Sequence, residues 1–308
     1  MQYQGAPRST QRESSPDGQT TVVEAPKTPE IWGTHSSPSD FVTITNLGRI
    51  IAITNQKGGV GKTTTAINLA ASLAANDVRV LLVDSDPQGN ATTGLGVKKS
   101  LDKTSIYDVL VGGASAEDAI VPTEMEGLEL LPADKNLVGA NLEIVAVEKR
   151  ELLLRNALHK IRDKYAYILI DCPPALDLLT LNALMAADSV LIPIQCEFFA
   201  LEGVSELLDT VDRVRESFGH PLKTEGVLLT MFDDRTNLTK LVAADLREFF
   251  GEDVFKTIIP RNVRLAEAPS HGKPVVLYDP ASRGAEAYIQ LAKEILSHEQ
   301  AAGSTSTR

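Results

Sequence analysis

The chain alternates between short apolar runs and longer stretches in which apolar residues recur at helical spacing. From Gly48 onward, the apolar runs are bounded by turn residues, as expected for buried parallel strands. The runs that predict strands are Arg49–Thr54, Arg79–Asp84, Leu128–Ala133, Tyr167–Asp171, Ser189–Gln195, Gly226–Met231 and Val254–Pro260. The stretches that predict helices are Thr63–Ala75, Lys149–Lys164, Leu201–Phe218, Leu238–Phe250 and Gly284–Leu296.

Because strands and helices alternate, we predict an α/β fold: a doubly wound, mostly parallel sheet with helices on both faces. No internal repeat or linker follows Gly48, so residues 47–297 are expected to form one domain. Residues 1–46 are rich in Ser, Thr, Pro, Gln and Gly and are expected to be a disordered tail. Within it, Ile31 and Trp32 could dock loosely on the core or bind a partner. Residues 298–308 are expected to be a flexible C-terminal tail.

The composition restricts the classes of function. The 308 residues carry a net charge of −11, which argues against a wholly basic nucleic-acid-binding protein but not against a local basic patch. No apolar run approaches the roughly 18 residues that a membrane span needs, and the N-terminus lacks the apolar segment of a secretory signal. With two cysteines, a disulfide framework is not expected, and a cytoplasmic location fits.

The stretch NQKGGVGKTTT, Asn55 to Thr65, joins a predicted strand to a predicted helix, as in a phosphate-binding loop. Its glycines allow the backbone to approach phosphate closely. Lys62 is expected to pair with the β- and γ-phosphates and Thr63 to ligate Mg²⁺. The predicted nucleotide-binding residues of the loop are Lys57, Gly58, Gly59, Val60, Gly61, Lys62, Thr63 and Thr64.

The loop departs from the standard pattern, because Gln56 replaces its first glycine and Lys57 is an additional lysine. The resulting K-G-G-x-G-K-[ST] resembles the deviant Walker A loop of the ParA/MinD family of P-loop ATPases. In that family this lysine reaches the nucleotide of the partner subunit, so the resemblance implies an ATP-bound homodimer and catalytic roles for Lys57 and Lys62. A second cation there would stabilise charge on the phosphoryl oxygens. The alternative is a solvated loop lysine.

Two acidic segments follow predicted strands. DSDPQGNAT, from Asp84, resembles the family's switch I, which implies that Asp86 orients the attacking water and touches the Mg²⁺ shell as a catalytic residue. YILIDCPP resembles Walker B with switch II, which places Asp171 beside Mg²⁺. The implied metal site therefore comprises Thr63, Asp86 and Asp171. Strand alternation points Cys172 to the face opposite Asp171, as a buried structural thiol.

The base is expected to be adenine, since the guanine-reading N-K-x-D pattern is absent. IIPRN resembles the family's adenine pocket, with Pro260 and Asn262 as its members. Longer stretches resemble chromosomal ParA proteins, also called Soj, from Arg49 to about Leu296. Among them are LLVDSDPQGNATTGLG, ILIDCPPALDLLTLNAL and IIPRNVRLAEAPSHGKPVVLYDPASRGAEAY.

This resemblance implies a chromosome-segregation ATPase that uses ATP and Mg²⁺. Its ATP-bound dimer would bind double-stranded DNA non-specifically on the nucleoid, and a ParB-type centromere-binding protein would stimulate slow hydrolysis and release. Arg235 aligns with a DNA-contacting arginine, with Arg264 and Lys273 as candidate neighbours. Lys223 to Lys273 holds eight Lys or Arg and eight Asp or Glu, so DNA binding would require clustering. Arg235 could instead pair with an adjacent aspartate. A scaffold protein at the cell pole is a further candidate partner.

Two rival readings share this ATPase core. A MinD-like, membrane-associated cell-division ATPase would need a C-terminal amphipathic helix that lies on the membrane. Here Lys293 is the only cation between Ala285 and Leu296, so a helix packed on the core is favoured and no membrane partner is predicted. An iron–sulfur carrier would need cysteines at a dimer interface or in a C-x-x-C pair, and Cys172 and Cys196 lack that spacing.

Overall fold

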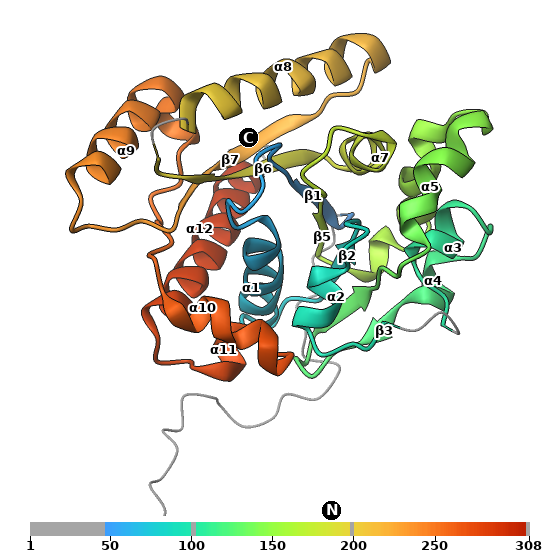
Figure 1. The fold of residues 1–308 in the computed structure, drawn as a ribbon, viewed down its shortest axis with the longest axis horizontal. Coiled ribbons are helices and arrows are strands. Elements are labelled where there is room, and N and C mark those ends of the chain that lie inside the picture. Colours follow the sequence, from blue (N-terminus) through green and yellow to red (C-terminus); the bar gives the residue numbers. More distant parts are fainter. Residues whose placement is uncertain (1–46, 100–102, 198–199, 306–308) are drawn as a thin grey trace, which may run out of the picture. The chain divides into compact units, whose positions relative to one another are not determined.

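The computed structural model describes residues 47–99, 103–197 and 200–305, and the expected tail at residues 1–46 lies outside them. Within the described residues, one seven-stranded sheet has the order β3-β4-β2-β5-β1-β6-β7 (Figure 1). All neighbouring strands pair in parallel except β3 with β4. The strands are β1 (Arg49–Ile53), β2 (Val80–Asp84), β3 (Val121–Pro122), β4 (Leu128–Leu131), β5 (Tyr167–Asp171), β6 (Ser189–Gln195) and β7 (Lys223–Thr230).

Helices follow most of the strands and return the chain to the other end of the sheet. The longer ones are α1 (Lys62–Ala74), α7 (Leu178–Ala186), α8 (Ala200–Phe218), α9 (Asn237–Phe250) and α12 (Arg283–Thr305). The shorter ones are α2 (Asn90–Gly94), α3 (Ile106–Leu110), α4 (Ala116–Ala119), α5 (Leu137–Glu143), α6 (Leu153–His159), α10 (Val263–Glu267) and α11 (Val275–Tyr278). The 3₁₀ turns are η1 (Ile144–Ala146), η2 (Arg150–Leu152), η3 (Arg162–Lys164), η4 (Gly251–Asp253) and η5 (Ala268–His271).

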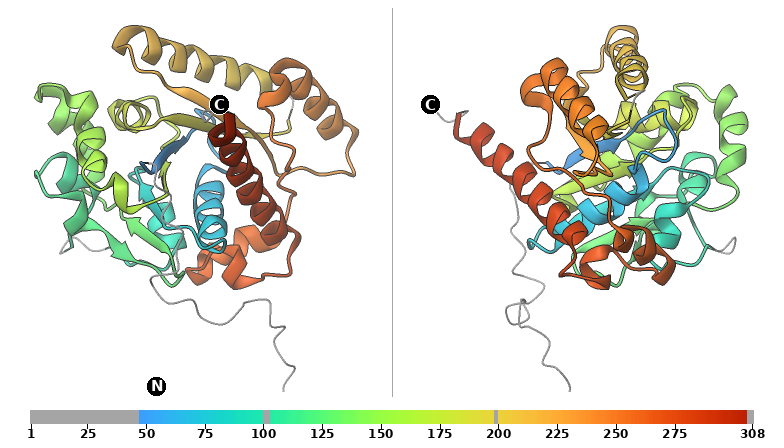
Figure 2. Two further views of the ribbon diagram at one scale, coloured as in Figure 1. Left: turned by 180° about the vertical axis from the view of Figure 1, so that it is seen from behind. Right: turned by 60° about the vertical axis from the view of Figure 1, so that its left-hand side comes forward.

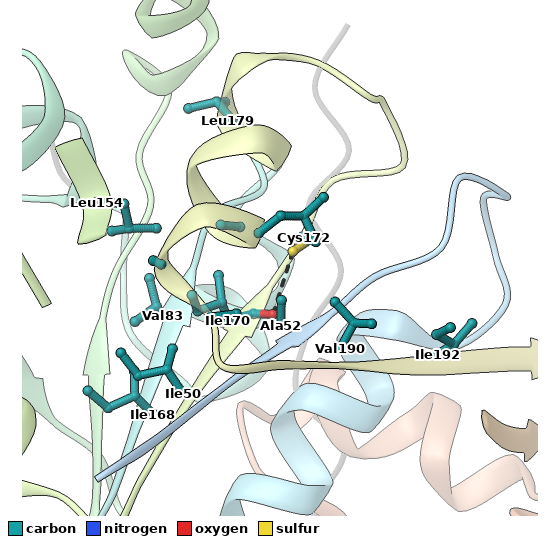
Figure 3. Close-up of a cluster of buried hydrophobic side chains, with 14 of the residues drawn as sticks. Ile50, Ala52, Val83, Leu154, Ile168, Ile170, Cys172, Leu179, Val190 and Ile192 are labelled. Carbon is teal, nitrogen blue, oxygen red and sulfur yellow. Dashed lines mark hydrogen bonds between the residues drawn. The ribbon is translucent and has the colours of Figure 1, made fainter. Parts of the chain in front are cut away.

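Both faces of the sheet are covered, because successive strand residues point to opposite sides and both sides are apolar. Ile51 and Ile53 of β1 belong to the core shared with α1 and α12, which lie side by side (Figure 2). Ile50 and Ala52 belong to the opposite core, which includes residues of α6 and α7 (Figure 3). This arrangement confirms the predicted doubly wound α/β fold.

Both cysteines are buried and free of disulfides. Cys172 lies within the apolar cluster of Figure 3, where its thiol donates to the carbonyl oxygen of Ile170 at 3.8 Å. Burial raises the pKa of Cys172, and it raises the pKa of Cys196 to about 11. The predicted burial of Cys172 is confirmed, and a raised thiol pKa disfavours the thiolate form that iron–sulfur ligation uses.

Helix α12 packs against α1 with its apolar face. Tyr288, Leu291 and Ile295 are at most 1% exposed, which confirms the expected packing on the core. The helix continues to Thr305, beyond the predicted end at Leu296, so the predicted domain boundary at residue 297 falls within it. None of the described helices combines the length and the apolar character that a membrane crossing requires.

The single helix predicted over Lys149–Lys164 is wrong. The segment forms η2, the short helix α6 and η3 instead. The cause lies in α7, where Asn182 accepts a hydrogen bond from the Leu154 amide at 3.1 Å and donates to the Arg150 carbonyl at 2.8 Å. In a continuous helix these two backbone groups would bond to each other. The buried Asn182 side chain therefore separates the first turn from the rest.

The strand predicted at Val254–Pro260 is also wrong. This segment forms no named strand. It meets β7 and the residue Phe232 through two isolated bridges, Val254 with Val227 and Pro260 with Phe232, and through a backbone hydrogen bond from the Ile259 amide to the Leu229 carbonyl at 2.9 Å. Between them, the amides of the two residues after Phe255 donate to the carboxylate of Glu294 on α12, at 2.7 and 3.0 Å. Because a side chain occupies these donors, the segment does not continue a ladder with β7.

We expect Asn182→Ala to destabilise the fold, because it leaves the Leu154 amide and the Arg150 carbonyl without their partner. The free energy of unfolding should fall by about 2 kcal/mol in a denaturant titration. Asn76→Ala is the control, because the side chain of Asn76, just after α1, makes a single local hydrogen bond, to the Ser72 carbonyl in the last turn of the helix. Equal stability of the two variants would contradict the bridging role of Asn182.

Candidate functional site

A loop from Thr54 to Gly61 joins β1 to α1. Gly59 and Gly61 have φ values of 77° and 93°, a conformation that residues with a side chain rarely adopt. A Cβ atom added at Gly58 or Gly59 would meet no atom within 4 Å, so the loop borders open space. Helix α1 begins at Lys62 without a side-chain cap, which leaves its first amides available to an anion.

Buried side-chain contacts hold this loop from two sides. Asn55 accepts a hydrogen bond from the Lys57 amide at 2.9 Å and donates to the Pro193 carbonyl of β6 at 2.8 Å. On the other side, the hydroxyl of Thr230 donates to the Val60 carbonyl at 2.8 Å. The ends of β6 and β7 therefore fix the loop backbone.

Lys62 is a buried cation in the middle of the site. Only 7% of the residue is exposed, and its ammonium donates to the carbonyl oxygen of Lys57 at 3.0 Å. Burial lowers the pKa of Lys62, and the negative charges of Asp171 and Asp86 oppose that shift. The ammonium is thus close to both the loop and two carboxylates, where it can pair with a phosphate group.

Two aspartates end neighbouring strands in register, Asp84 on β2 and Asp171 on β5, and both are fully buried. Asp84 accepts hydrogen bonds from the amide and hydroxyl of Thr92 at 2.7 and 2.6 Å. Within the described part of the chain, neither oxygen of Asp171 has a hydrogen-bond partner. Burial, reinforced by the charge of Asp84, raises the pKa of Asp171 well above its usual value, and burial raises the pKa of Asp84 to about 6.

This unpartnered carboxylate fits a divalent cation. The Thr63 hydroxyl and the positive charge of Lys62 act on Asp171 and oppose the rise in its pKa. Asp86 is 7% exposed, its charge acts on both Lys62 and Asp171, and it accepts a hydrogen bond from the Gln88 amide at 2.9 Å. No three His, Cys, Asp or Glu side chains among the described residues form a metal cluster. Phosphate oxygens and water would complete the shell, as Mg²⁺ prefers.

Lys57, the additional lysine, makes its contact outside this carboxylate cluster. Its ammonium forms an ion pair with Glu197, just after β6, and the two side chains are 39% and 36% exposed. A pair this exposed contributes at most about 1 kcal/mol. Lys57 can therefore leave Glu197 at little cost, and its role in a partner's site stays a prediction.

A pocket of about 410 Å³ opens beside the loop, within the size range of small-molecule sites. Gly61 and Thr64 line it from the loop and α1, and Pro260 and Asn262 line it from the segment before α10. The structure thus brings the predicted base-binding residues next to the predicted phosphate loop, although about 200 positions separate them in the sequence.

Thr230, Met231 and Tyr288 are among the lining residues that were not identified from the sequence. Met231 has a φ of 50°, a strained value for a residue with a side chain. The Tyr288 hydroxyl lies 3.1 Å from that of Thr65, which joins α12 to α1. All three sit in or beside apolar stretches, so no sequence motif distinguishes them from core residues.

A second hollow of about 790 Å³, here called the cationic groove, carries Arg235. Its charged lining residues are the cations Arg235, Lys256, Arg261 and Arg283 and the acids Asp233, Asp234 and Glu286. Pro260 and Arg261 line both this groove and the pocket beside the loop. One short segment therefore separates the two.

Arg235 is the most accessible of the predicted DNA-binding residues, with 81% of its side chain exposed. It forms two hydrogen bonds with the carboxylate of Asp233, at 2.8 and 2.6 Å. The Arg235 guanidinium holds the pKa of Asp233 well below its usual range. The pairing with a neighbouring aspartate, left open by the sequence, is thus present in the structure.

The other two predicted DNA-binding residues are also paired with carboxylates. Arg264 on α10 contacts Glu267 at 2.8 Å and Asp279 at 3.1 Å. Lys273, just after η5, contacts Glu124 at 2.5 Å. Each cation would have to exchange its carboxylate for a phosphate to bind DNA.

Comparison with known proteins identifies the family of the chain. A family model for an AAA domain matches residues 48–225, more than half of the chain. The sporulation initiation inhibitor protein Soj of Bacillus subtilis is 57% identical over 249 residues, covering 81% of this chain and 98% of that protein. The chromosome partitioning protein ParA of Caulobacter vibrioides is 54% identical over 254 residues, covering 82% and 95%. The chain belongs to the ParA/Soj family of chromosome-partitioning ATPases.

The ParA/Soj fold recurs in a solved structure bound to nucleotide. Cobyrinic acid a,c-diamide synthase from Mycobacterium smegmatis, determined with an ATP analogue and magnesium, matches with a TM-score of 0.72 and 37% identity. The match covers 82% of this chain and 96% of that one. This likeness agrees with the P-loop ATPase fold predicted from the sequence.

We expect Asp171→Asn to stabilise the ParA/Soj chain in the absence of nucleotide and Mg²⁺. Because the folded-state pKa of Asp171 is raised, its ionisation costs the folded state stability as the pH rises above the ordinary carboxyl range. The neutral amide removes that loss. A gain of about 1 kcal/mol should raise the thermal midpoint by about 2–4 °C near neutral pH.

Asp84→Asn is the matched control, because an amide cannot replace both oxygens that accept hydrogen bonds at that position. Its thermal midpoint should not rise. A loss in Asp171→Asn would show that Asp171 is satisfied without a cation. An equal gain in both variants would assign the effect to the repulsion between the two neighbouring carboxylates instead of to the missing partner of Asp171.

Proposed function

We propose that this ParA/Soj protein is an ATP-controlled switch for DNA segregation. ATP binds with its phosphates at the loop and its adenine between Pro260 and Asn262, and this closes a homodimer. The dimer binds double-stranded DNA on the nucleoid, in the cytoplasm, without sequence preference. A ParB-type centromere-binding protein stimulates hydrolysis, which opens the dimer and releases the DNA. The observation that carries this proposal is the segment shared by the nucleotide pocket and the cationic groove.

Each polar group at the loop has a role in this proposal. Lys62 and the first amides of α1 hold the phosphates, because both carry positive charge toward the open space beside the loop. Asp86 orients the attacking water. Mg²⁺, held by Thr63, Asp86 and Asp171, would neutralise charge on the β- and γ-phosphates. Asp171 then gains the partner that its buried carboxylate lacks among the described residues.

Lys57 links the nucleotide to the homodimer. It leaves Glu197 and reaches the phosphates bound by the partner subunit, where a cation stabilises the charge that develops during hydrolysis. Lys57 can bind the γ-phosphate of ATP, whereas ADP has no γ-phosphate to bind. ATP therefore favours the closed dimer. We expect unstimulated turnover well below the typical enzyme value of about 10 s⁻¹.

The cationic groove would contact DNA through backbone phosphates, since guanidinium and ammonium groups bind phosphates without reading bases. The acids in its lining weaken that contact in one subunit. A dimer presents two such grooves, and their contacts add along one duplex. Binding that depends on two weak grooves is readily lost when hydrolysis separates the subunits.

The DNA face is tested by measuring binding to a long, arbitrary duplex with Mg·ATPγS or Mg·ADP across a salt series. Wild type should bind with ATPγS and lose affinity as salt rises. Arg235→Ala should weaken binding about tenfold or more and reduce the salt dependence, because phosphate contacts are lost. Asp233→Asn should strengthen binding, because it releases Arg235 from its carboxylate.

Lys164→Ala provides a control, since Lys164 is an exposed cation paired with Glu117 away from the groove. Its DNA affinity should match that of wild type. Wild-type binding that is absent with every nucleotide would remove the proposed function. Equal losses in Lys164→Ala and Arg235→Ala would indicate a general charge effect instead of a DNA face at the groove.

A further inference from the structure

Thr230 connects the phosphate loop to the segment that carries Arg235. Its hydroxyl donates to the Val60 carbonyl at 2.8 Å, and both residues are only 2% exposed. Thr230 is the last residue of β7, and Arg235 follows five positions later in the same chain segment. A buried hydrogen bond of this kind, in a region of low dielectric constant, resists separation of its two partners.

Peptide geometry makes this contact relevant to phosphate binding. The Val60 carbonyl and the Gly61 amide belong to one planar trans peptide group, so the C=O and N–H bonds point in opposite directions. A hydrogen bond to the Val60 oxygen therefore fixes the direction of the Gly61 N–H, at the residue that precedes α1. A phosphate that accepts from this amide acts on the same rigid unit that Thr230 holds.

Beyond Thr230, backbone hydrogen bonds tie the chain to the wall of the nucleotide pocket. The Phe232 amide donates to the Ile259 carbonyl at 3.0 Å, and the Phe232 carbonyl accepts from the Arg261 amide at 2.9 Å. Met231, between Thr230 and Phe232, has its positive φ of 50°. This short, bonded path gives the segment little freedom to absorb a displacement at Thr230.

The same segment passes from one site to the other. Thr230 and Met231 line the nucleotide pocket, whereas Phe232 to Arg235 line the cationic groove. Asp233 holds the Arg235 backbone as well as its side chain, since it accepts from the Arg235 amide at 3.1 Å. A shift of the Val60–Gly61 peptide can therefore reach the Arg235 guanidinium through the hydrogen bond to Thr230, the short stretch of chain from Thr230 to Asp233, and the hydrogen bonds between Asp233 and Arg235.

We propose that Thr230 is a positioning residue that transmits the state of the phosphate loop to the cationic groove. This inference rests on the proposed function, because it names how ATP regulates the DNA contacts of that same site. Thr230 lines the nucleotide pocket, but its hydroxyl is bonded to the Val60 carbonyl, so its effect is assigned to the Val60–Gly61 peptide. Its contribution is a coupling free energy: removing the hydroxyl lowers the ratio of DNA affinities with ATP and with ADP.

The test compares Thr230→Val, which keeps the side-chain shape but has no hydroxyl, with Thr230→Ser, which restores the hydroxyl. Thr224→Val is the matched control, with the same chemical change near the opposite end of β7. Duplex affinity is measured with Mg·ATPγS and with Mg·ADP. The ratio of the two affinities should fall about fivefold or more in Thr230→Val and stay at the wild-type value in Thr230→Ser and Thr224→Val.

Hydrogen exchange of amides 232–236, with and without nucleotide, gives a readout that needs no DNA. Mg·ATPγS should change protection of these amides in wild type and Thr230→Ser but not in Thr230→Val. Should wild type bind no DNA while showing this change, and Thr230→Val lack it, the proposed function fails and the link stands. An unchanged affinity ratio and unchanged protection in Thr230→Val would overturn the link.

Two structural outcomes also decide the proposal. If Thr230→Ser loses the affinity ratio as fully as Thr230→Val, the hydroxyl is not the transmitting group and the proposal is overturned. If Thr230→Val does not fold, Thr230→Ala replaces it in both measurements with the same expected result. Failure of both variants to fold would assign Thr230 a purely structural role and would equally overturn the proposal.

Discussion

The structure depends on one buried carboxylate that the protein does not satisfy by itself. Asp171 ends the central strand β5 without exposure to water and without a hydrogen-bond partner among the described residues. Burying a charged group costs several kcal/mol unless it is paired. The Thr63 hydroxyl and the charge of Lys62 offset part of this cost. A divalent cation bound with phosphate offers the remaining compensation, so the site is complete only with its ligand.

The surrounding elements are arranged around this buried carboxylate and the ligand that would compensate its charge. Parallel strands bring their C-terminal ends to one edge, where Asp84 fixes the segment after β2 and Asp171 remains open. The loop before α1 faces this edge with amides and a buried lysine. Because β7 ends beside that loop and leads directly to the cationic groove, a change in ligand can reach a distant surface over a few residues. The end of β7 thereby connects the nucleotide site with the cationic groove.

Local sequence pattern was sufficient for six strands of the sheet and for the phosphate loop, because each depends on residues close together in the chain. The two-residue strand β3 was not predicted, since it is too short to show a pattern. It failed where a distant side chain takes over backbone hydrogen bonds. Asn182 interrupts a helix that its own leucine pattern favours, and Glu294 occupies amides that a strand would use. Residues such as Thr230 were missed for the same reason, since a threonine at the end of a strand gains its role only from a carbonyl 170 positions away. The motif match did identify Asp171, but its lack of partners is visible only in the fold.

The most direct measurement is calorimetric titration of the wild-type chain with ATPγS, once in Mg²⁺ and once in a chelator. If the buried carboxylate at Asp171 is completed by a cation held with the phosphates, binding should be much tighter with Mg²⁺, and Mg²⁺ alone should bind weakly. Equal affinity for the nucleotide in Mg²⁺ and in the chelator would contradict this, because Asp171 would then remain unpaired in the bound state.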